Sequence, residues 1–457
     1  MATHAAMWKQ LKCPIWPLSG LLALPACAGL PQLEVAPKVA AADWSMPTAS
    51  PNDARSDDLA TLLGSPELAH LIQSAQASSP ALLAATARID QARALVKLAR
   101  GAALPSLSVG TNLTAYRNAN PRGFDFSSNF ASIDAALSID IAGGNSARNR
   151  SASQRLAATG LEREALAVSL VSEIARTFVA RATLHARVDL IDRGIADSLK
   201  LQRIIELRQQ EGVATRVDVG LQAIRVHQLM AERDRLRQAF EETRVALALL
   251  VGAEAPVFES VPGTIEAFAV PDITPPPPSK LVAQRFDVRA AEARIASAGG
   301  DVAQARAAFF PQLDLSISRS ASSFLTGGAL SGLTLSAQLL APIFDRHRLR
   351  GNFELATAQQ HESVQNYRVT LLSALAQVEN GLAAVRHARE RAKFLLAEVE
   401  EAQRTTDLAR RQYLEGDADL RHLLDAEAIQ VSSQDAYLIS REERLDAAIV
   451  MYRVSRG

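Results

Sequence analysis

Residue types that carry catalysis or bind metals are few and scattered in this chain. It has eight histidines, among them His185, His227, His347 and His422, and two cysteines. No His-Glu-x-x-His pair, no phosphate-binding Gly-x-x-x-x-Gly-Lys turn and no Gly-x-Ser-x-Gly nucleophile turn occurs in the sequence. The acidic residues of the helical stretches fall among Arg and Lys at helical spacing, as on solvated helix faces. We therefore expect no enzyme, no metal site and no bound cofactor.

Covalent chemistry is predicted at one residue, Cys27. The stretch MWKQLKCPIWPLSGLLALPACAG, which begins at Met7, has the order of a secretory signal: basic residues, a short apolar run and small residues. Its end, LPAC, resembles a bacterial lipobox with an unusual Pro25, so we expect a signal peptide over 1–26, with Met7 as the true start, and a lipid on Cys27. The alternative is ordinary cleavage that discards Cys27. Both interpretations imply export.

Two short stretches, EGVATRVD and EGDADLRH, place a glycine and a capping residue where a helix could turn. Gly212 and Gly416 occupy equivalent positions in them, and glycine leaves a helix readily with positive φ. Thr215 and Asp419 follow at positions where a side chain could cap the next helix. Taken alone, these residues need no role beyond turning and capping.

Long helices must carry these turns, and the composition suits them. The 457 residues include 49 Lys+Arg and 49 Asp+Glu, 48% are hydrophobic and only 5% are aromatic. Zero net charge gives no general attraction to nucleic acid. No run of about 20 apolar residues follows residue 30, so we expect no transmembrane helix.

Proline marks where the long helices fit, because one inside a helix costs roughly 3 kcal/mol. No proline lies between Pro121 and Pro256, and none follows Pro342. We predict helical hairpins over 145–252 and 345–455. Apolar residues of the first hairpin recur at spacings of four, three and four, typical of a coiled-coil seam: Leu184, Val188, Ile191 and Ile195.

The chain is internally duplicated. Residues 84–107 and 290–313 align at a constant offset with 12 identities in 24 positions, including Pro105 and Pro311. Each of these prolines marks a corner from helix to strand. The predicted organisation is an extended lipidated segment at 27–57, a first repeat at 58–255, a proline-rich linker at 256–279 and a second repeat at 280–457.

Four stretches alternate apolar and polar residues with the period of a β-strand, at about 105–117, 131–142, 311–320 and 331–342. The pattern fits lipid outside and water inside a transmembrane barrel, and a half-buried sheet of a soluble protein would show it as well. Because four strands cannot close and open edges are not tolerated in lipid, several chains would share one barrel. Phe124, Phe126 and Phe130 fit either the lipid boundary or packing within the first loop.

These features together resemble a known family. The segments RFDVRAAEARIASAGGDVAQARAAFFPQLDLS, APIFDRHRLR, EGVATRVDVGLQA and EGDADLRHLLDAEA are similar to those of TolC-like outer-membrane efflux proteins, and most closely to the NodT-type lipoprotein branch. The similarity covers nearly all of the chain after Asp58. Phe286 stands where the family usually has proline, and GGN at 143–145 replaces the usual glycine-arginine exit from the first strand pair.

The resemblance implies a mostly α-helical protomer with a transmembrane β part. Three copies would form a 12-stranded barrel in the outer membrane above a periplasmic α-helical barrel. The implied partners are a periplasmic adaptor, an inner-membrane pump, often of the resistance-nodulation-division class, and outer-membrane lipid. The chain would be the passive exit duct of a tripartite efflux system in a Gram-negative bacterium.

The resemblance also assigns roles at the two turns, which form the periplasmic tip in this family. Gly212, Thr215 and Gly416 would contact the adaptor. Candidates for the constriction are three aspartates with neighbouring cations as counter-charges: Asp218, Asp419 and Asp425, with Arg216, Arg421 and His422. A three-fold axis would turn one carboxylate into a ring that favours cations. The alternative function is a periplasmic coiled-coil adaptor or structural lipoprotein, and the cargo is not identified by the sequence.

Overall fold

The computed structural model describes residues 43–45, 58–116, 126–261, 263–324 and 329–456. All of them belong to the unit Val39–Gly457. The predicted signal peptide, Cys27 and Phe124 lie outside the described residues, so the lipidated segment stays a prediction.

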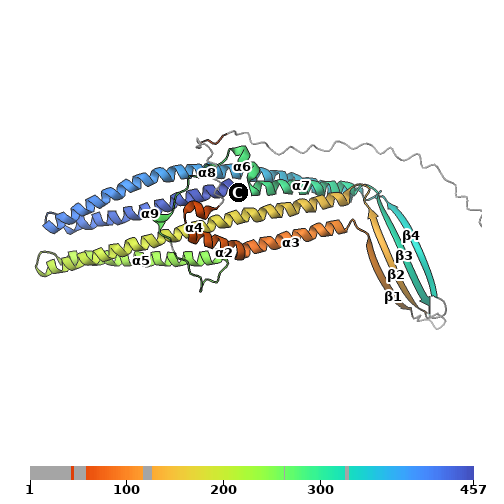
Figure 1. The fold of residues 1–457 in the computed structure, drawn as a ribbon, viewed down its shortest axis with the longest axis horizontal. Helices are drawn as coiled ribbons and strands as arrows, with labels where there is room; N and C mark the ends of the chain where they lie inside the picture. Colours follow the sequence, from red (N-terminus) through yellow and green to blue (C-terminus); the bar gives the residue numbers. More distant parts are fainter. Residues whose placement is uncertain (1–42, 46–57, 117–125, 262, 325–328, 457) are drawn as a thin grey trace, which may run out of the picture. The chain divides into compact units, whose positions relative to one another are not determined.

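Helices form most of the described chain, and the four strands lie at one end of it (Figure 1). The first repeat contains α1 Leu59–Leu63, α2 Pro66–Ser78, α3 Pro80–Gly101, β1 Ser106–Tyr116, β2 Phe126–Ile139, α4 Gly144–Gln210 and α5 Arg216–Val251. The linker carries the short 3₁₀ helix η1 Ile265–Ala267. The second repeat contains α6 Pro278–Gln284, α7 Phe286–Ala307, β3 Gln312–Phe324, β4 Ala329–Leu340, α8 Arg346–Glu415 and α9 Leu420–Arg456.

The strands form one antiparallel sheet in the order β1-β2-β3-β4. The pairing of β3 with β2 and with β4 runs on without a bulge. Two strands extend further than their alternation predicts: β2 begins at Phe126 and β3 continues to Phe324. The extra residues are rich in serine, which shows no hydrophobic alternation, and ladder pairing with the neighbouring strand holds them in the sheet.

The two faces of the sheet differ sharply in polarity. Rows of paired residues cross all four strands, and side chains on alternate rows point to opposite faces. One row is apolar: Leu107, Ala135, Ile317 and Leu335. The adjacent polar row is Ser108, Asp134, Ser318 and Thr334. Leu107 and Leu335 stay 74% and 79% exposed, so the described residues leave the apolar face uncovered.

Phe130 does not lie on the apolar face. It shares a row with Asn112 and Ser322 and has the same parity as Ser132 and Asp134. The placement of this side chain at the lipid boundary is therefore wrong, because the register of β2 puts it on the polar face.

The long helices extend away from the sheet. α4 has 67 residues and α8 has 70, which corresponds to roughly 100 Å each at 1.5 Å per residue. α5 packs along α4, α9 packs along α8, and α4 also contacts α9. The predicted coiled-coil seam is confirmed: Val188, Ile191 and Ile195 are buried together with Leu229 and Leu236 of α5. None of the described helices carries an apolar stretch long enough to cross a membrane.

Small residues let α4 and α7 approach closely beside the strands. A Cβ atom at Gly300 of α7 would lie 2.9 Å from the Cβ of Ser151 and 3.0 Å from the carbonyl oxygen of Ala147. A polar network crosses the same interface. Arg155 donates to Ser297 at 3.1 Å and to Asp301 at 2.5 Å, and Ser151 donates to Asp301 at 2.6 Å.

Candidate functional site

The two helix turns lie side by side at the end of the molecule away from the strands (Figure 1). The first joins α4 to α5 and the second joins α8 to α9. Gly212 and Gly416 have φ of 77° and 88°, in the left-handed region that favours glycine. The predicted turns and their glycines are therefore confirmed.

Thr215 and Asp218 form a reciprocal cap at the start of α5. The amide N–H of Asp218 donates to the Thr215 hydroxyl oxygen at 3.2 Å, and the amide of Thr215 donates to the Asp218 carboxylate at 2.7 Å. The Thr215 hydroxyl also donates to that carboxylate, at 2.8 Å. This capping box confirms Thr215 as a cap and gives the Asp218 carboxylate a local role in the turn.

Asp419 performs the equivalent task at the start of α9. Its carboxylate accepts a hydrogen bond from the amide of His422 at 2.9 Å, as the sequence predicts for an N-cap. The negative charge also lies at the positive end of the α9 dipole. Asp419 and Asp218 are thus both committed to helix starts.

Asp425 and Arg421 differ from these two capping aspartates. Both are exposed, and within the described part of the chain neither side chain makes a hydrogen bond or an ion pair. They stand four residues apart on α9 and so lie on the same face of the helix. The exposed side chains of Arg216 and His422 likewise have no partner among the described residues. The tip therefore presents both charges on its surface.

The sequence did not point to Arg208, which joins the two turns. This residue of α4 donates to the carbonyl oxygens of Tyr413 at 3.1 Å and Leu414 at 2.9 Å, in the last turn of α8. Its guanidinium carbon lies 4.8 Å from the centre of the Tyr413 ring. A cation at a helix C-terminus is favourable because the last carbonyls have no partner in their own helix. Arg208 follows the ordinary helical pattern of its own arm, so only the packing of α4 on α8 reveals its role.

Apolar side chains support the tip from both hairpins. The cluster contains Leu201 and Ile205 of α4, Ala409 and Tyr413 of α8, and Leu420, Leu423 and Ala426 of α9. The cluster brings α4, α8 and α9 together beside the two turns. The turns are therefore positioned by packing as well as by capping.

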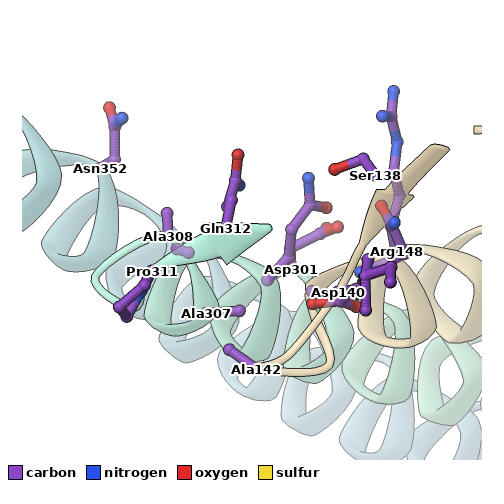
Figure 2. A pocket seen from close by; sticks show the side chains of 15 residues that line it. Ser138, Asp140, Ala142, Arg148, Asp301, Ala307, Ala308, Pro311, Gln312 and Asn352 are labelled. Carbon is purple, nitrogen blue, oxygen red and sulfur yellow. Dashed lines mark hydrogen bonds between the residues drawn. The ribbon is translucent and has the colours of Figure 1, made fainter. Parts of the chain in front are cut away.

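At the other end, the corner at Pro311 and the connection from β2 to α4 line a cavity of about 420 Å³ (Figure 2). β1 and β3 begin directly after Pro105 and Pro311, as the corners predict. Asp140 follows β2 and accepts from the amide of Asn145 at 2.5 Å. Burial raises the pKa of Asp140, but hydrogen bonds from the amides of residues 143–146 outweigh it and hold this pKa below its usual value. Asp140 thus caps α4, whose N-cap Gly143 has no side chain to do so.

A family model described as outer membrane efflux protein matches residues 71–253 and 278–455, one match for each repeat. The chain belongs to the outer membrane efflux protein family. The resemblance inferred from its sequence motifs is confirmed.

Individual relatives match most of the chain. The efflux protein is 32% identical over 459 residues to a pyoverdine export outer membrane protein of Pseudomonas putida, and the match covers 96% of each chain. It is 27% identical over 348 residues to nodulation protein T of Rhizobium leguminosarum, covering 74% of each. A crystal structure of a membrane protein from Pseudomonas aeruginosa superimposes with a TM-score of 0.84 at 26% identity, covering 94% of this chain and 100% of that one.

This efflux protein is an outer-membrane exit duct of a tripartite system, with the fold of trimeric TolC-like channels. The strands form the membrane part and the long helices extend into the periplasm. The alternative of an adaptor or structural lipoprotein that stays out of the membrane is thereby excluded. The family is one of transport components, and no group of His, Cys, Asp and Glu that could hold a metal occurs among the described residues.

Proposed function

We propose that three copies of this chain form a passive duct whose periplasmic tip is closed at rest by Asp425 and Arg421. Both edges of the sheet, β1 and β4, lack a partner within the described chain. Open edges are not tolerated in lipid, which supports closure by pairing β4 of one copy with β1 of the next. Twelve strands would then enclose the polar face, and the apolar face would meet lipid.

The observation that carries the gate is the pair of unpartnered charges on α9. Asp218 and Asp419 are held by their own helix starts, whereas Asp425 and Arg421 are exposed and free to pair. A three-fold axis near the tip would place three carboxylates and three guanidiniums around one opening. Ion pairs between chains would hold it shut, and Arg208 would hold the two hairpins of each chain together. Arg216 and His422 add positive charge beside this ring.

The gate is tested by single-channel recording of purified trimers in planar bilayers. Asp425→Asn and Arg421→Gln should each raise conductance several-fold, because either change removes every proposed ion pair. The control is Asp234→Asn, which changes an exposed aspartate of α5 that pairs with Arg233. Conductance unchanged in both tip variants would place the constriction elsewhere.

We also propose that a lipid on Cys27 anchors the chain. Trp44 donates from its indole nitrogen to the carbonyl oxygen of Pro276 at 2.9 Å, and the amide of Ser45 donates to Glu379 at 2.9 Å. The 16 residues between Cys27 and Trp44 can span at most about 60 Å. An anchored end could therefore reach a membrane at the level of the strands. Intact-mass analysis should show a diacylglyceryl and acyl adduct that Cys27→Ser abolishes, and an unmodified wild-type N-terminus would refute the anchor.

The remaining partners follow from the tip. A periplasmic adaptor would contact the turns at Gly212, Thr215 and Gly416 and transmit opening from an inner-membrane pump. The duct itself would catalyse no reaction, and the energy for export would come from that pump. Site-specific photo-crosslinking from Val213, an apolar residue 71% exposed beside the first turn, should capture the adaptor. Capture from exposed Leu249, far from the turn, serves as the negative control.

A further inference from the structure

One charged side chain interrupts the apolar face of the sheet. Arg319 of β3 has the same parity as Leu313, Leu315 and Ile317, which place their side chains on the apolar face. Its row consists of Val109, Ile133, Arg319 and Leu333. The pairing of β3 continues without a bulge on both sides, so no shift of register turns Arg319 toward the polar face.

Among the described residues, no carboxylate lies on the same face as this guanidinium. The strand carboxylates Asp134 and Asp314 lie on the opposite face, and within the described residues Arg319 makes no hydrogen bond or ion pair. β3 is flanked by β2 and β4 of its own chain, so the next copy could approach only beyond β4. The strand expected there is β1, whose apolar face carries Leu107, Val109 and Thr111 and no acid. The described strands therefore supply no counter-ion on this face, which points to one from outside the protein.

The position of Arg319 along the strand identifies the side of the membrane. Leu313 lies in the first apolar row above the corner. Arg319 lies six residues beyond Leu313, which is roughly 20 Å along a strand. With the usual barrel tilt this is roughly 15 Å above that row, in the outer half of an apolar band about 25 Å tall. A long arginine can extend its head group toward the nearer interface. That interface is the outer leaflet, because the corners face the periplasm.

Polar side chains begin just above Arg319 on the same face. The next row contains Thr111 and Ser331 beside Ala131 and Ala321, and the row beyond contains Asn129 and Ser323 beside Leu113. These positions are exposed. Hydroxyl and amide groups beside a guanidinium can together donate several hydrogen bonds to one phosphate, and arginine binds phosphate in a bidentate manner.

We infer that Arg319, with Ser323 and Ser331, binds a phosphate group of a glycolipid in the outer leaflet of the outer membrane. The inference rests on the strands spanning that membrane and not on the gate or on the lipid at Cys27. Each trimer would hold three such lipids, one on the outer face of each set of strands. The contact fixes the height of the barrel in the bilayer, because charge pairing occurs only where the phosphates lie.

The test compares wild-type trimers with Arg319→Leu, Arg319→Lys and the control Arg404→Gln. Arg404 is an exposed arginine of α8 that pairs with Glu401. Arg319→Leu replaces a cation on a lipid-facing strand by an apolar side chain, so the barrel should still assemble as a heat-modifiable trimer. Trimers purified from outer membranes are delipidated and then titrated with diphosphoryl lipid A, with lipid A lacking both phosphates, or with inorganic phosphate. Native mass spectrometry counts the molecules bound.

We expect up to three diphosphoryl lipid A molecules on wild-type and Arg404→Gln trimers, at least tenfold weaker binding to Arg319→Leu, and intermediate binding to Arg319→Lys. Phosphate-free lipid A should bind all variants equally weakly. Equal binding of diphosphoryl lipid A to wild type and Arg319→Leu would overturn the inference. Displacement of the lipid by millimolar inorganic phosphate would also overturn it, by identifying a free anion as the ligand. Absence of trimers in every sample would instead refute the membrane-spanning barrel.

Discussion

At the tip, some side chains cap helices and are already hydrogen-bonded, whereas others are exposed and free to pair between chains. Thr215 and Asp218 satisfy one another and the first amides of α5, so their loss should loosen the turn itself. Thr215→Ala should cost about 1 kcal/mol, which speeds amide exchange over residues 216–219 by roughly fivefold. Hydrogen exchange measured by mass spectrometry checks this. Thr159→Ala removes a hydroxyl bonded only to the carbonyl of Arg155 and should leave tip exchange unchanged.

The ionised carboxylate of Glu442 in α9 lowers the stability of the fold, so its effect depends on pH. Burial against α4 raises the pKa of Glu442, and the negative charge of Asp446 adds to the rise, whereas Thr183 and Arg187 oppose it. Because the folded pKa lies above the unfolded value, the ionised carboxylate destabilises the fold above that pKa, and the penalty is relieved as pH falls through it. Glu442→Gln should therefore raise the unfolding temperature at pH 8 and lose this advantage on acidification. A pH-independent difference between variant and wild type would contradict the assignment.

At the scale of elements, the contact between α4 and α7 depends on the absence of a side chain at Gly300. A methyl group there would meet the backbone nitrogen of Ser151 at 2.9 Å, so the two helices would have to separate. Gly300→Ala should cost about 1–3 kcal/mol, as overpacking does. Gly160→Ala in α4 meets nothing within 4 Å and should stabilise by about 0.5–1 kcal/mol. Thermal unfolding of the two variants should shift in opposite directions.

The same elements explain what the sequence could predict. The absence of proline and the two-residue period of β-strands are local features of the sequence. The hairpins, the strands and the turns at Gly212 and Gly416 were therefore predictable. Arg208 and Asp140 were not, because each acts on a helix end through tertiary packing or an unusual cap position. The sequence predicted the cap at Asp419, but the capping role of Asp218 and the unpartnered side chain of Asp425 needed coordinates. The start of β2 was missed because its serines hide the alternation.

At the scale of the whole molecule, the duplication gives each half a helix–strand–strand–helix unit, and the halves meet where β2 pairs with β3. The pairing makes one continuous sheet with one apolar and one polar face, yet its outer edges stay open. The register of one protomer therefore determines which side chains face outward and which face the lumen, but its four strands are too few to close a barrel. Two consecutive residues of β4 can test which face of the sheet meets lipid.

Leu335 lies on the apolar face and Ser336 on the polar face. Lysine on a lipid-facing strand costs about 2–4 kcal/mol near the bilayer midplane, whereas a lumenal lysine stays in water. Leu335→Lys should therefore reduce heat-modifiable trimers in outer-membrane fractions strongly. Ser336→Lys should assemble normally and shift ion selectivity toward anions in planar bilayers, because three added cations would line the lumen. Equal assembly of both variants, with no change in selectivity, would mean that the apolar face does not meet lipid.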